Sequence, residues 1–273
     1  MLSFNAKKQL MEFLSEDIGK GDITSALLPK RNISARIISR EEAIVAGVKY
    51  AKEIFKLKGC NVTVVKKDGS KIKPNQTIMT ISGDAGKILT CERTALNLLT
   101  RMSGIATQTD QMVQKISNKK TKLYATRKTA PGLRYFDKEA VEIGGGKKHR
   151  LKLDEMVMIK DNHIAVSDSL LSLIKNAKRK YKKFEVEVEN TTDAILAAKE
   201  GATIIMLDNF SPEQIKKTIQ ILKNQKLRDK VMLEASGGIN SKNIAKYGNT
   251  GVDIISVGSI TNSVKGIDMS LEI

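Results

Sequence analysis

Residues 203–209 read Thr-Ile-Ile-Met-Leu-Asp-Asn, an apolar run that ends in an acidic and an amide side chain. A short apolar run without polar alternation is typical of a parallel strand that is buried on both faces. Helical patterns flank this run at 191–200 and 212–223. A strand between two helical segments predicts a βαβ unit and therefore a parallel sheet.

The same pattern recurs on both sides of this stretch. Two further helical patterns span 167–181 and 241–246. A series of strands and helices of this kind favours either a parallel α/β barrel or an open doubly wound sheet. The other candidate strands span 123–126, 156–159, 184–188, 231–234 and 253–257.

The chain before residue 105 has a different texture, because helical and extended patterns alternate there without a repeating unit. We expect an α+β module in this part. Its predicted helices span 4–17, 41–58 and 87–103, and the second of them should end at Gly59. Its predicted strands span 33–37, 62–65 and 77–81, with a turn at Asp68-Gly69 between the last two.

The composition narrows the class of protein. A chain of 273 residues fits one large domain or two smaller ones, and 41% hydrophobic with 28% charged residues is ordinary for a folded chain. No apolar run is long enough for a membrane span, and two lysines fall within residues 1–8, where a signal peptide would need apolar residues. Cys60 and Cys91 are too isolated for a disulfide framework or a zinc site, so we expect a cytoplasmic protein.

The net charge of +17 requires either anionic partners or lysines on solvated faces. The basic clusters at 66–67, 119–120, 147–150 and 178–183 are spread along the chain. The chain has no tryptophan and only 4% aromatic residues, so stacking platforms for single-stranded nucleic acid are scarce. A nucleic-acid-binding protein is therefore the weaker alternative, and salt-sensitive retention on DNA would support it.

Polar side chains follow nearly every predicted strand of the second part. The carboxyl ends of parallel strands converge on one mouth, so we expect these side chains to line one basin. Capping of strand ends by solvated charges explains any one of them but explains the series poorly. Cations, carboxylates and glycine-rich turns together suit a substrate with several negative charges, held partly through a divalent metal. The residues are Arg127-Lys128, Lys160-Asp161, Glu189, Asp208-Asn209, Ser236-Gly237-Gly238 and Gly258-Ser259.

The densest polar segments are Thr126 to Gly132 and Gly144 to Arg150. Arg127 offers a planar fork for a carboxylate or phosphate, and Lys128 offers a compact point charge. The triple glycine at 144–146 would let backbone approach a ligand closely, and a mobile surface loop is the alternative interpretation. No P-loop pattern occurs in the sequence.

The chain has two histidines, His149 and His163. We interpret His163, which follows a predicted strand, as a structural hydrogen-bonding residue. Lys148 and Arg150 flank His149 and should disfavour its protonated form. In either state His149 could donate a hydrogen bond to a carboxylate.

Several further motifs occur from about residue 10 to the C-terminus. They are Glu16 to Thr24, Glu92 to Asn97, Ser103 to Thr107, Met156 to Ile164, Glu187 to Asn190, Leu207 to Asn209, Glu234 to Gly238 and Gly251 to Gly258. Together with the two dense segments, and in this order, they closely resemble the quinolinate phosphoribosyltransferase family.

The resemblance implies a reaction and an architecture. Quinolinate and phosphoribosyl pyrophosphate would give nicotinate mononucleotide, pyrophosphate and carbon dioxide, with Mg²⁺, in NAD biosynthesis. An N-terminal α/β sandwich (1–105) would precede an incomplete α/β barrel of TIM-like type (106–261), and residues 262–273 would return to the first domain. The family forms homodimers with a shared active site, which can assemble further into hexamers.

The resemblance also implies roles for single residues. Arg93 would come from the partner subunit to quinolinate, and Lys128 would lie between the two substrates as a catalytic residue. Glu189 and Asp208 would act at the ribose hydroxyls and Mg²⁺. The quinolinate site would further contain Arg127, Thr129, His149, Arg150 and Lys160, and the 5′-phosphate site Ser236, Gly237, Gly238, Gly258, Ser259 and Ile260.

Three residues depart from the family pattern. Ala130 replaces a frequent threonine, and Lys148 replaces a common asparagine. Asn262 stands where a histidine near the phosphate is frequent, and its amide can still donate a hydrogen bond. The nearest rival is a related protein associated with molybdenum transport, which shares the fold. Met156 to Ile164, which contains Lys160, favours quinolinate chemistry.

Overall fold

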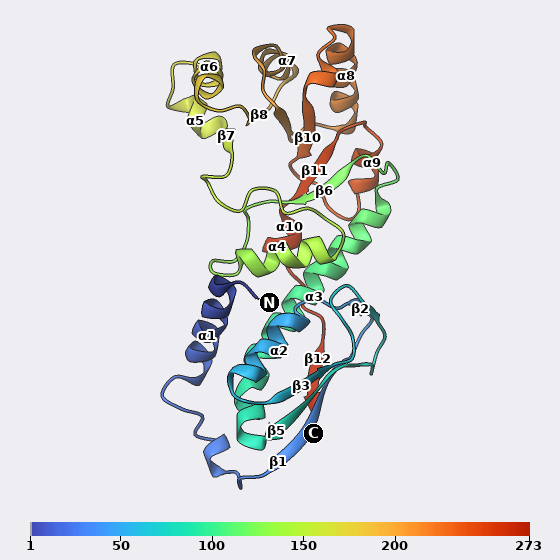
Figure 1. Cartoon of the computed structure of the whole chain (residues 1–273). Coiled ribbons are helices and arrows are strands. Elements are labelled where there is room, and N and C mark those ends of the chain that lie inside the picture. Colours follow the sequence, from blue (N-terminus) through green and yellow to red (C-terminus); the bar gives the residue numbers. More distant parts are fainter. Residues whose placement is uncertain (1) are drawn as a thin grey trace. The chain divides into compact units, whose positions relative to one another are not determined.

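The computed structural model describes residues 2–273, so expectations that concern Met1 lie outside the described residues. The chain divides into two compact units (Figure 1). The first unit runs to Gln108 and also includes 142–144 and 263–273, and the second comprises 109–141 and 145–262. The division thus falls after 108 and after 262, whereas the boundaries expected from the sequence fall after 105 and 261.

The first unit contains a four-stranded antiparallel sheet in the order β12-β1-β5-β3. The C-terminal strand pairs with β1, so that Leu271 lies opposite Ile37. The strands are β1 (Asn32–Ser39), β3 (Asn61–Val64), β5 (Thr77–Asp84) and β12 (Met269–Glu272), and β2 (Ala43–Ile44) pairs separately with β4 (Lys71–Ile72). The helices are α1 (Phe4–Ile18), the 3₁₀ turn η1 (Ser25–Leu27), α2 (Val48–Leu57) and the first part of α3 (Ala85–Lys115).

The predicted helix over 41–58 is partly wrong, because α2 begins only at Val48. Gly47 precedes it with φ +96°, and a Cβ at this position would lie 3.0 Å from Sδ of Met102. Ala43 and Ile44 form the short strand β2 instead of a first helical turn. The close approach of the chain to α3 therefore requires glycine here and breaks the helical pattern.

The second unit contains a six-stranded sheet in the order β6-β11-β10-β9-β8-β7, whose paired strands are all parallel. The strands are β6 (Lys122–Ala125), β7 (Val157–Ile159), β8 (Phe184–Val188), β9 (Ile204–Asp208), β10 (Met232–Ser236) and β11 (Ile254–Val257). The helices are the end of α3, α4 (Arg134–Ile143), α5 (Asp161–Ala165), α6 (Leu170–Lys180), α7 (Thr191–Glu200), α8 (Pro212–Asn224), η2 (Arg228–Lys230), α9 (Ile244–Gly248) and α10 (Ser259–Asn262).

All six predicted parallel strands form, and the expected α/β class with a separate sheet in the N-terminal unit is confirmed. Among the described residues β6 and β7 are the two edge strands and do not pair, so the barrel is incomplete. The helix α4 was not expected, because polar residues mask the apolar face formed by Phe136, Ala140 and Val141. The described helices include none that is both long and apolar enough to span a membrane.

The register of the sheet determines which side chains share a face. Glu187 on β8 lies opposite Met206 on β9, which lies opposite Glu234 on β10. Side chains at paired positions of neighbouring strands point to the same face of a sheet. The structure therefore places two glutamates and a methionine side by side on one face of the sheet.

Candidate active site

A cavity of about 370 Å³ lies within the second unit, at the carboxyl ends of the parallel strands. Side chains from several strands and from the loops that follow them line it, as expected for a parallel α/β sheet. The lining consists of Ala125, Thr126, Arg127, Lys128, His149, Arg150, Met158, Lys160, Glu187, Met206, Asp208, Glu234, Ser236 and Ser256.

The turn after β6 places Arg127 and Lys128 in the cavity. The amide of Lys128 donates to Oγ1 of Thr126 over 3.1 Å, and the hydroxyl of Thr261 donates to the carbonyl of Lys128 over 2.7 Å. A Cβ at Gly258 would lie 3.0 Å from Cδ of Lys128. The small residue at 258 therefore leaves room for the lysine stem beside β11.

The segment that carries His149 and Arg150 runs beside β6. Lys147 donates to the carbonyl of Leu123 over 2.8 Å and accepts from the amide of Ala125 over 2.9 Å. A Cβ at Gly146 would lie 2.7 Å from Cγ1 of Val141. This part of the triple glycine therefore serves close packing against α4, and no ligand is needed to explain it.

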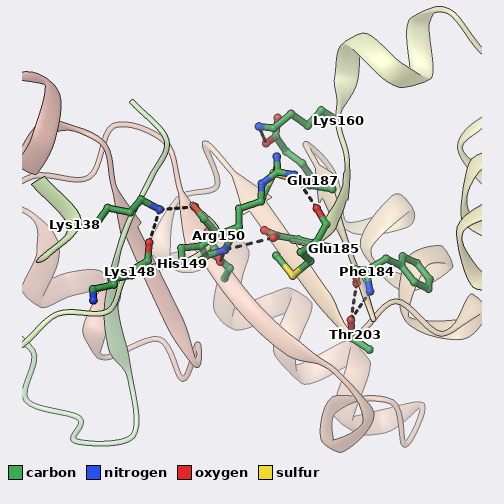
Figure 2. A network of polar contacts seen from close by, with 12 residues as sticks. Lys138, Lys148, His149, Arg150, Lys160, Phe184, Glu185, Glu187 and Thr203 are labelled. Carbon is green, nitrogen blue, oxygen red and sulfur yellow. Dashed lines mark hydrogen bonds and ion pairs between the residues drawn. The ribbon is translucent and has the colours of Figure 1, made fainter. Parts of the chain in front are cut away.

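A buried lysine, Lys138 on α4, holds the backbone on both sides of His149. Its Nζ donates to the carbonyl oxygens of Lys148 and Arg150 (Figure 2). Burial and, to a smaller extent, the nearby Arg134 lower the pKa of Lys138 to about 8. His149 has φ +50°, a conformation that residues other than glycine rarely adopt. The sequence did not single out Lys138, since its neighbours gave no sign that α4 faces this loop.

Each of the two arginines of the cavity has a guanidinium nitrogen without a partner among the described residues. Arg150 donates from Nη1 to the carbonyl of Met156 over 2.8 Å, and its Nη2 lies 3.2 Å from Sδ of Met158. The Nε atoms of Arg150 and Arg127 are buried and have no hydrogen-bond partner among the described residues. A buried donor without a partner costs free energy, so an anionic ligand would relieve both of them.

The acidic side of the cavity contains Asp208 and Glu187. Glu187 accepts from Nζ of Lys160 over 2.5 Å, and Oδ2 of Asp208 accepts from the side-chain amide of Asn209 over 2.7 Å. Asn209 in turn donates from its backbone to the carbonyl of Ser236 over 2.9 Å. The ends of β9 and β10 are thereby fixed together, with the Asp208 carboxylate at the cavity.

The structure brings seven of the predicted site residues into this cavity, namely Arg127, Lys128, His149, Arg150, Lys160, Asp208 and Ser236. The others do not line it. Thr129 accepts a hydrogen bond from Nε of Arg134 over 3.2 Å, and Arg93 lies exposed on α3 in the first unit. Gly237 and Gly238 lie in the turn after β10, Gly258 follows β11, and Ser259 and Ile260 begin α10.

Glu189 is exposed and does not line the cavity, whereas Glu187 does. β8 ends at Val188, so Glu187 is the last acidic residue within the strand and Glu189 lies beyond it. The prediction assigned the polar function to the residue after the strand. The alternating glutamates of 185–189 could have indicated that one of the two earlier residues faces the cavity.

The expectation that His149 avoids its protonated form is wrong. Burial lowers the pKa of His149, but Glu185 and Glu234 outweigh burial and raise the pKa to about 9. The prediction considered only the sequence neighbours Lys148 and Arg150. His163 is exposed, and its Nδ1 accepts from the backbone of Lys160 over 3.0 Å, where it caps α5.

Lys148 and Asn262 depart from the expected family pattern at the edges of the site. Nζ of Lys148 forms an ion pair with Glu139 on α4. Asn262 is exposed at the end of α10. Neither residue lines the cavity.

Comparisons with known proteins cover both units. Residues 22–103 match the family "Quinolinate phosphoribosyl transferase, N-terminal domain" and residues 105–272 match "Quinolinate phosphoribosyl transferase, C-terminal domain". A relative from Methanothermobacter thermautotrophicus, named "Probable nicotinate-nucleotide pyrophosphorylase (carboxylating)", is 45% identical over 97% of each chain. The "Nicotinate-nucleotide pyrophosphorylase (carboxylating)" of Mycobacterium leprae is 37% identical over 98% of this chain and 97% of its own.

A solved structure shows the same fold. The nicotinate-nucleotide pyrophosphorylase from Francisella tularensis superimposes with a TM-score of 0.92 and 39% sequence identity. The match covers 100% of this chain and 97% of that chain. The similarity therefore includes both units and the cavity.

Proposed function

The chain belongs to the quinolinate phosphoribosyl transferase family, and we propose that the cavity described above binds the two substrates of its reaction. It is a phosphoribosyltransferase that transfers the phosphoribosyl group to quinolinate with decarboxylation, in NAD biosynthesis. The observation that carries the proposal is the lining of one cavity by Arg127, Arg150 and Lys160 together with the carboxylate of Asp208.

Quinolinate, a pyridine with two carboxylates, binds on the cationic side. The unpaired Nε donors of Arg127 and Arg150 support this assignment, because each charge-assisted hydrogen bond contributes about 1.5–3 kcal/mol. Lys160 and His149 add further positive charge on this side of the cavity. Arg93 is exposed, and in our proposal it reaches the quinolinate of a partner subunit.

The phosphoribosyl donor binds on the acidic side. Asp208 lies at the cavity with Glu187, so we assign the ribose hydroxyls to these two carboxylates and move the role expected of Glu189 to Glu187. Lys128 lies between the substrates. The 5′-phosphate accepts hydrogen bonds from the backbone amides of residues 236–238 and 258–260. Supporting observations are the positive φ values of Gly237 and Gly238 and the buried hydroxyl of Ser259, which has no hydrogen-bond partner among the described residues.

The donor set also fits Mg²⁺, because Asp208 and Glu187 offer the hard carboxylate oxygens that this ion prefers. Asp208 would hold the ion together with oxygens of the phosphoribosyl donor. Glu187 already pairs with Lys160, so its share would be indirect. Bound Mg²⁺ would neutralise negative charge on the pyrophosphate leaving group.

The charges of the cavity match the charges of the reaction. Breaking the bond between ribose and pyrophosphate builds positive charge on the sugar and negative charge on the leaving group. The carboxylates of Asp208 and Glu187 stabilise the sugar cation, and Lys128 stabilises the leaving group. Fixed charges need no reorganisation during the reaction. After the ring nitrogen attacks, the pyridinium stabilises the carbanion left by the departing carboxylate, so the protein mainly orients and encloses.

We further propose that the protein is a cytoplasmic homodimer. Ile23 and Leu27 of the first unit are both 84% exposed, and large apolar side chains at the surface favour burial against another protein surface. The exposed Arg93 lies in the same unit and would be free to act in trans. The assembly of such dimers into hexamers is part of the same proposal.

The substrate assay tests this assignment. Purified protein should release carbon dioxide from quinolinate only when phosphoribosyl pyrophosphate and Mg²⁺ are both present, and chelation should stop the release. Nicotinate, which lacks the second carboxylate, should be a poor substrate because it leaves part of the cationic side unpaired. Equal turnover of nicotinate, or full activity with a chelator present, would contradict the proposed site.

A further inference from the structure

Two buried glutamates beside His149, Glu185 and Glu234, have no role in the substrate contacts proposed above. Glu185 lies on β8 and Glu234 on β10, and their side chains are 0% and 1% exposed. Each glutamate places its Oε2 atom 3.4 Å from Nε2 of His149. Figure 2 shows the His149 ring beside Glu185.

The two carboxylates have no other polar partner. Among the described residues, none of their four oxygen atoms has a hydrogen-bond donor, and each glutamate forms its ion pair with His149. A buried carboxylate is costly unless a positive charge or hydrogen-bond donors compensate it. A cation between Glu185 and Glu234 would compensate both carboxylates.

The groups around the imidazole of His149 hold it in place between Glu185 and Glu234. Tyr124 on β6 lies edge-on to the ring with centroids 5.7 Å apart, and Lys138 fixes the carbonyls on both sides of His149. The Arg150 guanidinium binds Met156 and Met158, while Lys160 pairs with Glu187. Arg150 and Lys160 thus have other partners, and among the described residues it is His149 that pairs with both glutamates.

The protonation of this trio follows from its charges. Burial lowers the pKa of His149, but Glu185 and Glu234 raise it to about 9, while burial raises the pKa of Glu185. Arg150, which lines the cavity, acts on Glu185 and reduces the excess negative charge of the trio. The two carboxylates, each 3.4 Å from Nε2, favour a proton on that nitrogen. Only the imidazolium also makes Nδ1 a donor, because a neutral ring would present a lone pair there.

We propose that Glu185 and Glu234 are positioning residues that share the Nε2 proton of His149 and hold the ring as an imidazolium, so that Nδ1 can donate to an anionic substrate. The inference rests on the proposed function only for the identity of that substrate, quinolinate. The glutamates act through His149, and neither needs to touch the substrate.

A divalent metal ion is the other cation that this trio could hold. One ligand atom from each of His149, Glu185 and Glu234 lies within 4.8 Å of the other two, a spacing that a metal ion could bridge. The surroundings favour the proton, because Arg127, Arg150 and the buried Lys138 would repel a further dication. The protonated ring supplies one positive charge at the two carboxylates, and Arg150 compensates part of the remaining negative charge.

Nitrogen NMR of the histidine rings tests the protonation state directly. Because the chain has two histidines, the His163→Gln variant leaves one ring signal, and that signal belongs to His149. Without substrate, both nitrogens of His149 should show imidazolium shifts at pH 7.5, and the ring should titrate near pH 9. A neutral His149 at pH 7.5 overturns the proposal, and so does a stoichiometric bound metal ion found by elemental analysis. This measurement does not involve quinolinate, so it stands or falls independently of the proposed function.

Variants of the glutamates then test positioning against a merely structural role. In Glu234→Gln the pKa of His149 should fall by at least two units from about 9, which leaves at most about a tenth of the rings protonated at pH 8. The KM for quinolinate should then rise about 10-fold at pH 8 but less at pH 6, where the ring protonates again. Glu234→Asp keeps a carboxylate and should restore much of the effect. Glu213→Gln, the same change at an exposed position on α8, should alter neither quantity. If Glu234→Gln does not fold, Glu185→Gln replaces it. An unchanged pKa, or a KM that rises equally at both pH values, contradicts the proposal.

Discussion

Gly237 shows at the scale of one residue how the backbone shapes the phosphate side of the cavity. It has φ +88°, and a Cβ there would lie 2.6 Å from the backbone nitrogen of Asn209. Its neighbour Gly238 also has a positive φ, of +60°, but an added Cβ would meet nothing within 4 Å. The two glycines therefore differ in packing and share the conformational requirement.

Alanine at these two positions should separate packing from conformation. Gly238→Ala should lower the free energy of unfolding by about 1 kcal/mol, which is the cost of a left-handed conformation. Gly237→Ala should cost at least about 2 kcal/mol more, because backbone must also move. Urea unfolding of both variants measures the difference. Equal losses would mean that the contact with Asn209 relaxes freely.

The place of charged residues at the ends of strands could be predicted from the sequence. The place of charged residues that face the cavity from within a strand could not. Arg127, Lys160 and Asp208 each follow or end an apolar run, so their place at the cavity mouth follows from topology. Glu234 is hidden inside the buried strand β10, and its environment depends on a histidine from a distant loop. The prediction of the protonation state of His149 failed for the same reason, because its sequence neighbours are cations whereas its spatial neighbours are glutamates.

At the scale of elements, the end of β8 determines which carboxylate lines the cavity. The strand ends at Val188, which leaves Glu187 at the cavity and Glu189 exposed beyond it. Glu187→Gln should lower kcat by about 10²-fold, because it removes a fixed negative charge near the sugar cation. Glu189→Gln should retain more activity than Glu187→Gln in the same assay. A larger loss in Glu189→Gln would restore the original assignment of the sequence motif.

Long periodic elements were the most predictable. The strands of the second unit and helices such as α8 form close to where apolar patterns place them. The helix α3 runs to Lys115, beyond the predicted end at 103, because Ile105, Ala106 and Met112 continue its buried face. The strand β12 pairs with β1 from the opposite end of the chain, and no local pattern announces such a partner.

At the scale of the whole molecule, the proposed homodimer predicts complementation between inactive subunits. Arg93→Ala removes the residue given to the partner, and Lys128→Ala removes one that stays in the home cavity. A mixture of the two variants should regain about a quarter of wild-type activity, because half of random dimers are mixed and each has one intact site. Subunit exchange must be confirmed by mass spectrometry of tagged chains. No recovery in exchanged dimers would contradict a site shared between subunits.

The basic character of the molecule provides the most direct test of the cavity, because bulk charge and fixed geometry make different predictions. Arg150 lines the cavity and Lys182 is exposed before β8, yet both contribute one positive charge. The decisive measurement is the KM for quinolinate, from carbon dioxide release, in Arg150→Ala and Lys182→Ala. If the cavity binds the diacid through placed donors, KM should rise about 100-fold in Arg150→Ala and stay within about 2-fold in Lys182→Ala. Equal changes in the two variants would show that net charge, and not this cavity, attracts the substrate.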